Sequence, residues 1–243
     1  MFKRLLFFFI FSTSFVSAQI DYSDSWEDFF SYNNVKDFVK VDNMLYALSD
    51  NAIFTYDDTT QEIEKLSSVQ GLSGETTSAI HYSIETNRLV IGYENGLIEV
   101  VDSDGSITIS ADIVSFNQTG EKSINDIFEY QGKLYLSTSF AIVEYDITEL
   151  EFGDTFFIGN NSTDVNIHQI TVFNDRIFAA TEDGIFYADS ANPNLIDFNN
   201  WNIITSANNN FKNITVFNNK LYTILNTQLY EVNEMNELDC YIS

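Results

Sequence analysis

Few side chains in this chain have the type and spacing that catalysis or metal binding requires. The two histidines, His81 and His168, have no second His or Cys three or four residues away, which is the spacing that a zinc site would show. Both fall inside predicted strands, where ordinary hydrogen bonds account for them. The chain contains neither a Gly-x-Ser-x-Gly nucleophile turn nor a glycine-rich phosphate loop. We therefore predict no catalytic residue, no metal site and no cofactor, and the sequence identifies no ligand-binding residue.

The 36 acidic residues are the other candidates for chemistry. Adjacent acids occur at 57–58 (Asp-Asp) and 182–183 (Glu-Asp). A glycosidase needs two carboxylates that face each other at one site, and the sequence does not place any two together. Residues 102–105 (Asp-Ser-Asp-Gly) resemble the start of a calcium-binding loop but lack its later glutamate, so we interpret them as a hairpin turn.

The charge balance disfavours some partners. The chain has 11 basic against 36 acidic residues, a formal net charge of −25, and a predicted leader removes two of the basic residues, Lys3 and Arg4. Nucleic acid is a poor partner because phosphate binding needs basic patches, and an anionic membrane surface would repel the chain. High solubility is the simplest consequence, and a basic protein partner is the more specific one. The single cysteine, Cys240, provides no disulfide, so the fold must bury an apolar core.

The elements that must position these side chains are the strands of an internal repeat. Two sets of apolar landmarks recur with the same successive gaps of 44, 45, 43 and 44 residues. The first set is Leu45, Leu89, Leu134, Ile177 and Leu221, and the second is Ile53, Leu97, Ile142, Ile185 and Leu229. Periods of about 40–50 residues with short strands are typical of β-propeller blades. A sandwich or an up-and-down barrel is the alternative, but neither requires a constant period over five units.

Each unit predicts four strands. The first strands are predicted at Val35–Val41, Ser78–Ile84, Ile124–Tyr130, Ile167–Phe173 and Phe211–Phe217. Two-residue turns follow at 42–43, 86–87, 131–132, 174–175 and 218–219, where Asn, Asp and Gly accept positive φ. The second strand of each unit is apolar and begins at the first landmark, and the third strand begins at the second landmark. In the second unit, one extra residue within 97–102 predicts a β-bulge in the third strand. Variable fourth strands are predicted at Glu62–Leu66, Ser106–Ser110, Thr155–Ile158 and Trp201–Thr205.

These patterns predict an all-β fold: a β-propeller of about five four-stranded blades, which is an incomplete part of a larger propeller. Its units lie near 35–76, 77–122, 123–164, 165–210 and 211–243, within a propeller region 19–243. Residues 1–18 are predicted to be a secretory signal peptide, with a positive start, an apolar run from Leu5 to Val16 and small residues before Gln19. The run is shorter than the roughly 20 residues that span a bilayer, which disfavours a transmembrane anchor.

Closure of the ring depends on the segment Trp26–Phe30. It resembles Trp201–Thr205 and is therefore predicted to be the outer strand of a closing blade. The last unit shows three strands in its pattern, followed by residues 234–243. Trp26–Phe30 either completes that unit and closes a five-bladed ring, or belongs to a blade that this chain does not contain. We favour the second arrangement, in which the chain is part of a longer protein.

Three segments carry a family resemblance: the opening at 26–35 (Trp-Glu-Asp-Phe-Phe-Ser-Tyr-Asn-Asn-Val), the Gly-Leu-Ser linker at 71–73 and the Asn-Gly-Leu turn at 95–97. The repeat resembles the regulator-type propellers of Bacteroidetes proteins, and the opening resembles the N-terminal β-propeller of PorZ-type proteins of the type IX secretion system. The resemblance implies a cell-surface complex that removes the C-terminal signals of exported cargo and attaches the cargo to anionic lipopolysaccharide. The propeller component is not the peptidase, and no site residue carries over. Such proteins also have a second propeller and a C-terminal sorting domain, and we expect neither within residues 19–243.

We expect a non-enzymatic, exported propeller that acts as a scaffold or binding module of type IX secretion and cell-surface attachment. The expected partners are proteins of a cell-surface secretion complex, with anionic lipopolysaccharide as a further candidate, and the expected location is the periplasm or the outer cell surface. One alternative is a periplasmic ligand-sensing propeller of a hybrid two-component regulator, which the repeat type fits equally well. A secreted carbohydrate-active enzyme is the other, and it requires clustered carboxylates at one site.

Overall fold

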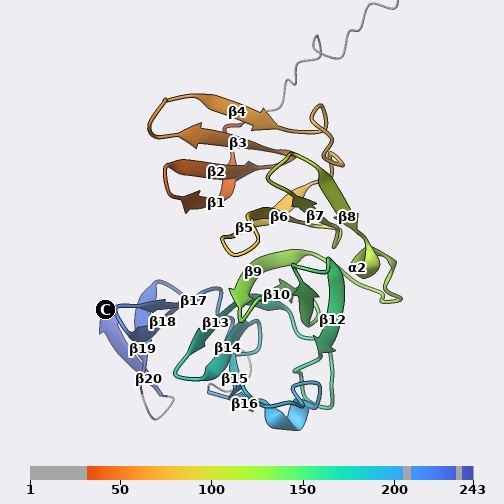
Figure 1. The fold of residues 1–243 in the computed structure, drawn as a ribbon. Coiled ribbons are helices and arrows are strands. Elements are labelled where there is room, and N and C mark those ends of the chain that lie inside the picture. Colours follow the sequence, from red (N-terminus) through yellow and green to blue (C-terminus); the bar gives the residue numbers. More distant parts are fainter. Residues whose placement is uncertain (1–31, 205–208, 234–236, 243) are drawn as a thin grey trace, which may run out of the picture.

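The computed structural model describes residues 32–204, 209–233 and 237–242. Within these ranges, five antiparallel sheets follow one another along the chain, each with four strands in sequence order (Figure 1). The fold is therefore all-β, an incomplete β-propeller, as the repeat predicts. The predicted signal peptide 1–18 and the predicted strand Trp26–Phe30 lie outside the described residues.

The first three sheets lie within residues 35–156. The first contains β1 (Val35–Val41), β2 (Met44–Ser49), β3 (Ala52–Asp57) and β4 (Ile63–Leu66). The second contains β5 (Thr77–Ser83), β6 (Arg88–Tyr93), β7 (Ile98–Val101) and β8 (Ile107–Ser110). The third contains β9 (Ile124–Tyr130), β10 (Lys133–Thr138), β11 (Ile142–Asp146) and β12 (Glu151–Phe156).

The last two sheets lie within residues 167–242. The fourth contains β13 (Ile167–Phe173), β14 (Arg176–Thr181), β15 (Ile185–Asp189) and β16 (Asn202–Ile203). The fifth contains β17 (Ile214–Phe217), β18 (Lys220–Leu225), β19 (Gln228–Val232) and β20 (Leu238–Ile242). Two short helices, α2 (Asp112–Ser115) and η3 (Phe198–Asn200), lie in connections. In the described part of the chain, no helix is both long and apolar enough to cross a membrane.

The sheets are arranged around a common centre (Figure 1). Their innermost strands contact one another in chain order, β1 with β5, β5 with β9, β9 with β13 and β13 with β17. A separate hydrophobic core fills each of the four junctions between neighbouring sheets. The first landmark of the repeat supplies one buried residue to each core, namely Leu89, Leu134, Ile177 and Leu221. Stacking of equivalent sheets therefore explains the constant spacing of these residues.

The turn after the innermost strand has the predicted chemistry in most units. Positive φ occurs at Asp42, Gln131, Asn174, Asp175, Asn218 and Asn219. The turn predicted at 86–87 is wrong, because Ser83 pairs with Arg88 and a four-residue turn, 84–87, joins β5 to β6. The innermost strand of this unit consequently begins and ends one residue earlier than predicted, at Thr77 and Ser83.

The β-bulge predicted in the third strand of the second unit is also wrong. Gly92 pairs with Ile98 in a regular register, and the extra residue lies in the turn 94–96, which Tyr93 and Leu97 close. The second landmark of this unit is therefore Ile98, which is fully buried in the core, as Ile53 is in the first unit.

The last unit forms a complete four-stranded sheet. Its fourth strand, β20, pairs with β19, so the prediction of three strands in this unit is wrong. Its first strand begins at Ile214 rather than Phe211. In the third unit, the fourth strand spans Glu151–Phe156 and begins before the predicted segment Thr155–Ile158.

The first sheet turns one apolar face away from the other described sheets. Phe38 on β1 is 64% exposed. The residues at the same repeat position in the later units are at most 6% exposed, namely Ile80, Ile127, Ile170 and Ile214. Each of those later residues has a preceding sheet beside it, whereas β1 has none among the described residues. This difference in exposure is what an incomplete ring of sheets produces.

Candidate functional site: the central cavity

The innermost strands of the first four sheets share a register shift near their starts. One extra residue is inserted in β1, β5, β9 and β13 relative to the paired second strand. A bulge of this kind bends a strand and turns a side chain in a new direction. The inserted residues are Lys36, Ser78, Asn125 and His168, and Lys212 holds the same repeat position before β17.

These five residues line one cavity of about 350 Å³. The other lining residues directly follow the inserted positions and are Asp37, Asp126, Gln169 and Asn213. The cavity therefore lies where the innermost strands of all five sheets begin. Every lining side chain is polar or charged, in contrast to the apolar cores of the junctions.

The side chains that follow the inserted residues connect neighbouring innermost strands. Three of them, Asp37, Asp126 and Gln169, accept a hydrogen bond from a backbone N–H of the next innermost strand; the donors are Ile80, Ile170 and Ile214, the last at 2.9 Å. In the second unit this position is Ala79, which has no acceptor side chain. Because the five sheets form separate backbone ladders, these contacts link them around the cavity.

Burial changes the protonation of the two aspartates. Desolvation is the largest cause for Asp126 and raises its pKa to about 7, against hydrogen bonds from the amides of Ile170 and Ile127, while the charge of Asp37 raises it further. Desolvation also raises the pKa of Asp37. Two carboxyl groups in one cavity are the feature that a glycosidase would need. Both also accept hydrogen bonds from backbone amides of the next innermost strand.

The lysines of the cavity have different partners. Lys36 Nζ donates to the carbonyl oxygen of Thr77 at 2.8 Å and lies 3.2 Å from Glu94 Oε1 and 3.3 Å from Asp50 Oδ1. This lysine therefore ties the first sheet to the second at the rim of the cavity.

Lys212 Nζ lies 3.1 Å from His168 Nε2. Burial first, and the charge of Lys212 second, lower the pKa of His168, so the imidazole is neutral at pH 7 and its Nε2 accepts from the ammonium group. Nearby, the buried Oγ of Ser78 has no hydrogen-bond partner within the described structure. A hydroxyl, an ammonium group and amide side chains thus converge on one polar cavity, an arrangement suited to binding a polar ligand.

The other histidine does not reach the cavity. His81 Nε2 lies 2.9 Å from Glu129 Oε2, and Ser83 Oγ donates to Glu129 Oε1 at 2.9 Å. These contacts join β5 to β9, so His81 links the second sheet to the third.

The acidic residues noted in the sequence accept hydrogen bonds from backbone N–H groups in turns and connections. Asp57 Oδ1 accepts from the backbone N–H of Thr59 at 2.6 Å, and Glu182 Oε1 accepts from that of Asn166 at 3.1 Å. Residues 102–105 lie in the turn between β7 and β8, where Asp104 Oδ1 accepts from the backbone N–H of Ser106 at 2.9 Å. Over the described ranges, no group of three or more His, Cys, Asp or Glu side chains is placed to hold a metal ion.

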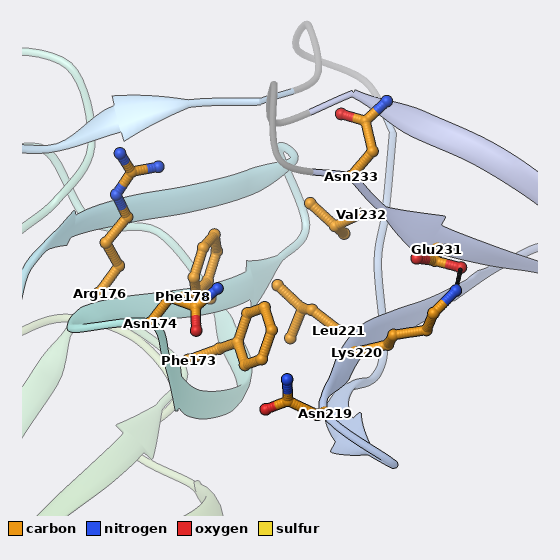
Figure 2. Close-up of a pocket in the computed structure, with 10 residues that line it drawn as sticks. All are labelled: Phe173, Asn174, Arg176, Phe178, Asn219, Lys220, Leu221, Glu231, Val232 and Asn233. Carbon is orange, nitrogen blue, oxygen red and sulfur yellow. Dashed lines mark hydrogen bonds and ion pairs between the residues drawn. The ribbon is translucent and has the colours of Figure 1, made fainter.

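A second pocket, of about 400 Å³, lies between the fourth and fifth sheets, at the far ends of their innermost strands (Figure 2). Its floor is apolar and consists of Phe173, Phe178, Leu221 and Val232. Its polar lining consists of Asn174, Arg176, Asn219, Lys220, Glu231 and Asn233, and Lys220 Nζ pairs with Glu231 Oε2 at 2.8 Å. No sequence motif marks this pocket, and His168 is the one residue of the central cavity that its type singles out in the sequence.

The sequence matches a protein family over residues 45–202, more than half of the chain. That family is described as the N-terminal β-propeller domain of PorZ, of the TSS9 secretion system. The matched range runs from the first sheet to the fourth. No curated protein matches the sequence.

Solved structures share the fold at low sequence identity. PorZ, an essential bacterial surface component of the type IX secretion system of Porphyromonas gingivalis, aligns with a TM-score of 0.73 and 18% identity, over 86% of this chain and 28% of PorZ. The extracellular domain of a hybrid two-component system from B. thetaiotaomicron aligns with a TM-score of 0.67 and 17% identity, over 89% of this chain and 29% of that chain. At these identities the likeness establishes the fold alone, and the chain spans less than a third of either relative.

Proposed function

We propose a function from one premise: the chain belongs to the family of PorZ N-terminal β-propeller domains of the type IX secretion system. On this premise, the chain is a non-enzymatic, exported propeller that acts as a scaffold or binding module in type IX secretion and in the attachment of cargo to the cell surface. The family match over residues 45–202 is the observation that carries this proposal. The central cavity supports it, because convergent polar side chains without an activated nucleophile favour binding over catalysis.

The proposed partners are proteins of the surface secretion complex. A net charge of −25 favours a partner with a basic contact surface, because complementary charge speeds association and disfavours acidic competitors. Anionic lipopolysaccharide is the second candidate, and Lys36 and Lys212 at the cavity are the cations that would meet its charged groups. The proposed location is the periplasm or the outer cell surface.

Deletion of the gene tests the proposal directly. We expect the deletion strain to lose surface-attached cargo and to regain it when the wild-type gene is returned. Complementation with Lys212→Met tests the cavity, and Lys220→Met, which changes a lysine at the other pocket, is the matched control. Intact export and attachment of cargo in the deletion strain would refute the role in secretion.

The second candidate function is ligand sensing, which the likeness to the extracellular domain of a two-component system favours. The same deletion strain separates the two functions. A scaffold predicts that cargo transcripts stay at wild-type levels while the cargo protein is lost from the surface. A sensor predicts the reverse, a loss of transcript induction by an external ligand with secretion of other cargo unchanged.

A further inference from the structure

The connection from the second sheet to the third, residues 111–123, is the longest between sheets that the structure describes in full. It contains α2, which lies at the outer edge of the molecule between β8 and β12 (Figure 1). Its apolar residues are divided between interior and surface. Ile113 is 4% exposed and belongs to the core of the junction, whereas Val114 is 38% exposed and Phe116 45% exposed.

Phe116 is the outer end of an aromatic stack. Its ring stacks on that of Phe140, with centroids 5.9 Å apart and an interplanar angle of 13°. Phe157 lies 6.5 Å from Phe116 and 6.2 Å from Phe140, measured between centroids. Phe140 is only 2% exposed, so the stack runs from the surface into the core between the second and third sheets.

A cavity of about 170 Å³ opens beside this stack. Its walls are mainly apolar and consist of Ile113, Phe116, Phe140, Val143 and Phe152, with Asp112 and Thr155 as the polar lining residues. An apolar cavity of about 150 Å³ is large enough to bind one benzene molecule. The cavity beside Phe116 therefore has the size and lining for one phenyl-sized side chain.

The cavity is formed before any partner arrives. Lys122 Nζ donates to the carbonyl oxygens of Val114 at 2.7 Å and Phe116 at 2.6 Å, which fixes the chain just after α2. Ile113 packs tightly onto Gly96, where an added Cβ would lie 2.6 Å from Ile113 Cγ2. A preformed site avoids the cost of ordering a loop on binding.

The charge around the cavity indicates which kind of residue lies beside the phenyl-sized side chain of a partner. Asp112 is the one charged residue among those that line the cavity. Lys122, whose ammonium group donates to the carbonyl oxygens of Val114 and Phe116, does not line the cavity. We propose that this cavity, the Phe116 pocket, docks a protein partner that inserts one phenyl-sized side chain next to a basic residue. Aromatic side chains buried in such pockets supply much of the binding energy of protein interfaces. This docking does not depend on a role in secretion, so it goes beyond the function proposed above.

A titration of the full chain with short peptides tests this proposal. The probe is acetyl-Lys-Phe-Lys-amide, and methyl resonances of Ile113 and Val143 report binding. We expect saturable shifts with this peptide and at least tenfold weaker binding when alanine replaces its phenylalanine. We also expect weaker binding of acetyl-Glu-Phe-Glu-amide at low salt, with a smaller difference at high salt, because salt screens surface charge.

Two variants and a control locate the site. Phe116→Ala removes the exposed wall and should weaken binding at least tenfold, and Thr155→Phe should fill the pocket and abolish it. Phe217→Ala, at a phenylalanine that is 71% exposed on the fifth sheet, should leave binding unchanged.

Four results would overturn the proposal. Equal binding of the alanine peptide would show that no phenyl-sized group is recognised, and unchanged binding by Phe116→Ala would place the site elsewhere. A dimer in sedimentation that Phe116→Ala dissociates would make a second copy the occupant. Equal binding of the Glu-Phe-Glu peptide at low salt would overturn the requirement for a basic neighbour.

Discussion

Replacement of Asp126 by asparagine tests whether burial in the central cavity removes water from the Asp126 carboxyl group and so raises its pKa. Asp126 accepts a hydrogen bond from the backbone N–H of Ile170, and desolvation raises its pKa to about 7. Asparagine keeps the shape and an acceptor oxygen but carries no charge at any pH. We expect the stability of Asp126→Asn relative to wild type to be higher at pH 9 than at pH 5, by about 2–3 kcal/mol.

The direction of this effect follows from proton linkage. Asp126 ionises near pKa 3.8 in the unfolded chain and near 7 in the folded protein. Between these values the folded state holds a proton that the unfolded state has lost, so the contribution of Asp126 to stability falls as pH rises. The loss is complete above about pH 8. A pKa difference of about three corresponds to at most about 4 kcal/mol in the free energy of unfolding.

Urea unfolding at pH 5, 7 and 9 measures the difference between variant and wild type. Trp201, which is 7% exposed in the core between the third and fourth sheets, provides the fluorescence signal. A carbon NMR titration of the Asp126 carboxyl group supplies a second reading and should show a midpoint near 7. In that titration, Asp37→Asn should lower the midpoint, because the charge of Asp37 helps to raise it.

Asp104→Asn is the control for this experiment. Asp104 is fully exposed, and a hydrogen bond from the backbone N–H of Ser106 lowers its pKa, so it does not titrate between pH 5 and 9. Its stability difference from wild type should be the same at every pH. If Asp126→Asn also gives the same difference at pH 5 and pH 9, within about 1 kcal/mol, the cavity does not desolvate its lining and the reasoning is refuted.

Three further substitutions test packing and charge elsewhere. Tyr93→Phe removes the hydroxyl that donates to the fully buried carboxylate of Glu99, and urea unfolding should show a loss of about 2 kcal/mol; an unchanged midpoint would contradict the need for this donor. Gly92→Val adds a side chain where a Cβ alone would lie 2.8 Å from an isoleucine of β9, and should cost about 1–3 kcal/mol in the same assay; wild-type stability would show that the two sheets separate easily. Lys212→Met should raise the pKa of His168 in an NMR titration, because the lysine charge helps to lower it; an unchanged pKa would contradict the contact at 3.1 Å.

Much of the fold was predictable because apolar residues that recur at the repeat spacing are buried between neighbouring sheets. The second landmark also lies in the junction cores, where Ile53, Ile142 and Ile185 are fully buried. An apolar residue that every junction needs must recur at the spacing of the sheets. Spacing does not reveal which part of a unit absorbs an extra residue, however. In the second unit a turn absorbs it rather than a strand, and only the pairing of Gly92 with Ile98 shows this.

The last strand was missed although its sequence carries a signal. In β20, Leu238, Cys240 and Ile242 alternate with polar or aromatic residues, which is the period-two pattern of a strand. The prediction of three strands in the last unit gave that pattern too little weight. A fourth strand pairs only with the third strand of its own sheet, so its position along the chain is less constrained than that of the inner strands.

The central cavity escaped a search for motifs because its residues agree in position and differ in type. Lys36, Ser78, Asn125, His168 and Lys212 occupy one column of the repeat, directly after a column that is fully buried in the last four units. Packing at equivalent junctions holds the apolar columns constant, whereas a bulged residue that faces the common axis meets no equivalent neighbour. A column that is polar in every unit and varied between units therefore identifies the axis of a repeat ring. Alignment of the five units on their core landmarks would have exposed this column from the sequence alone.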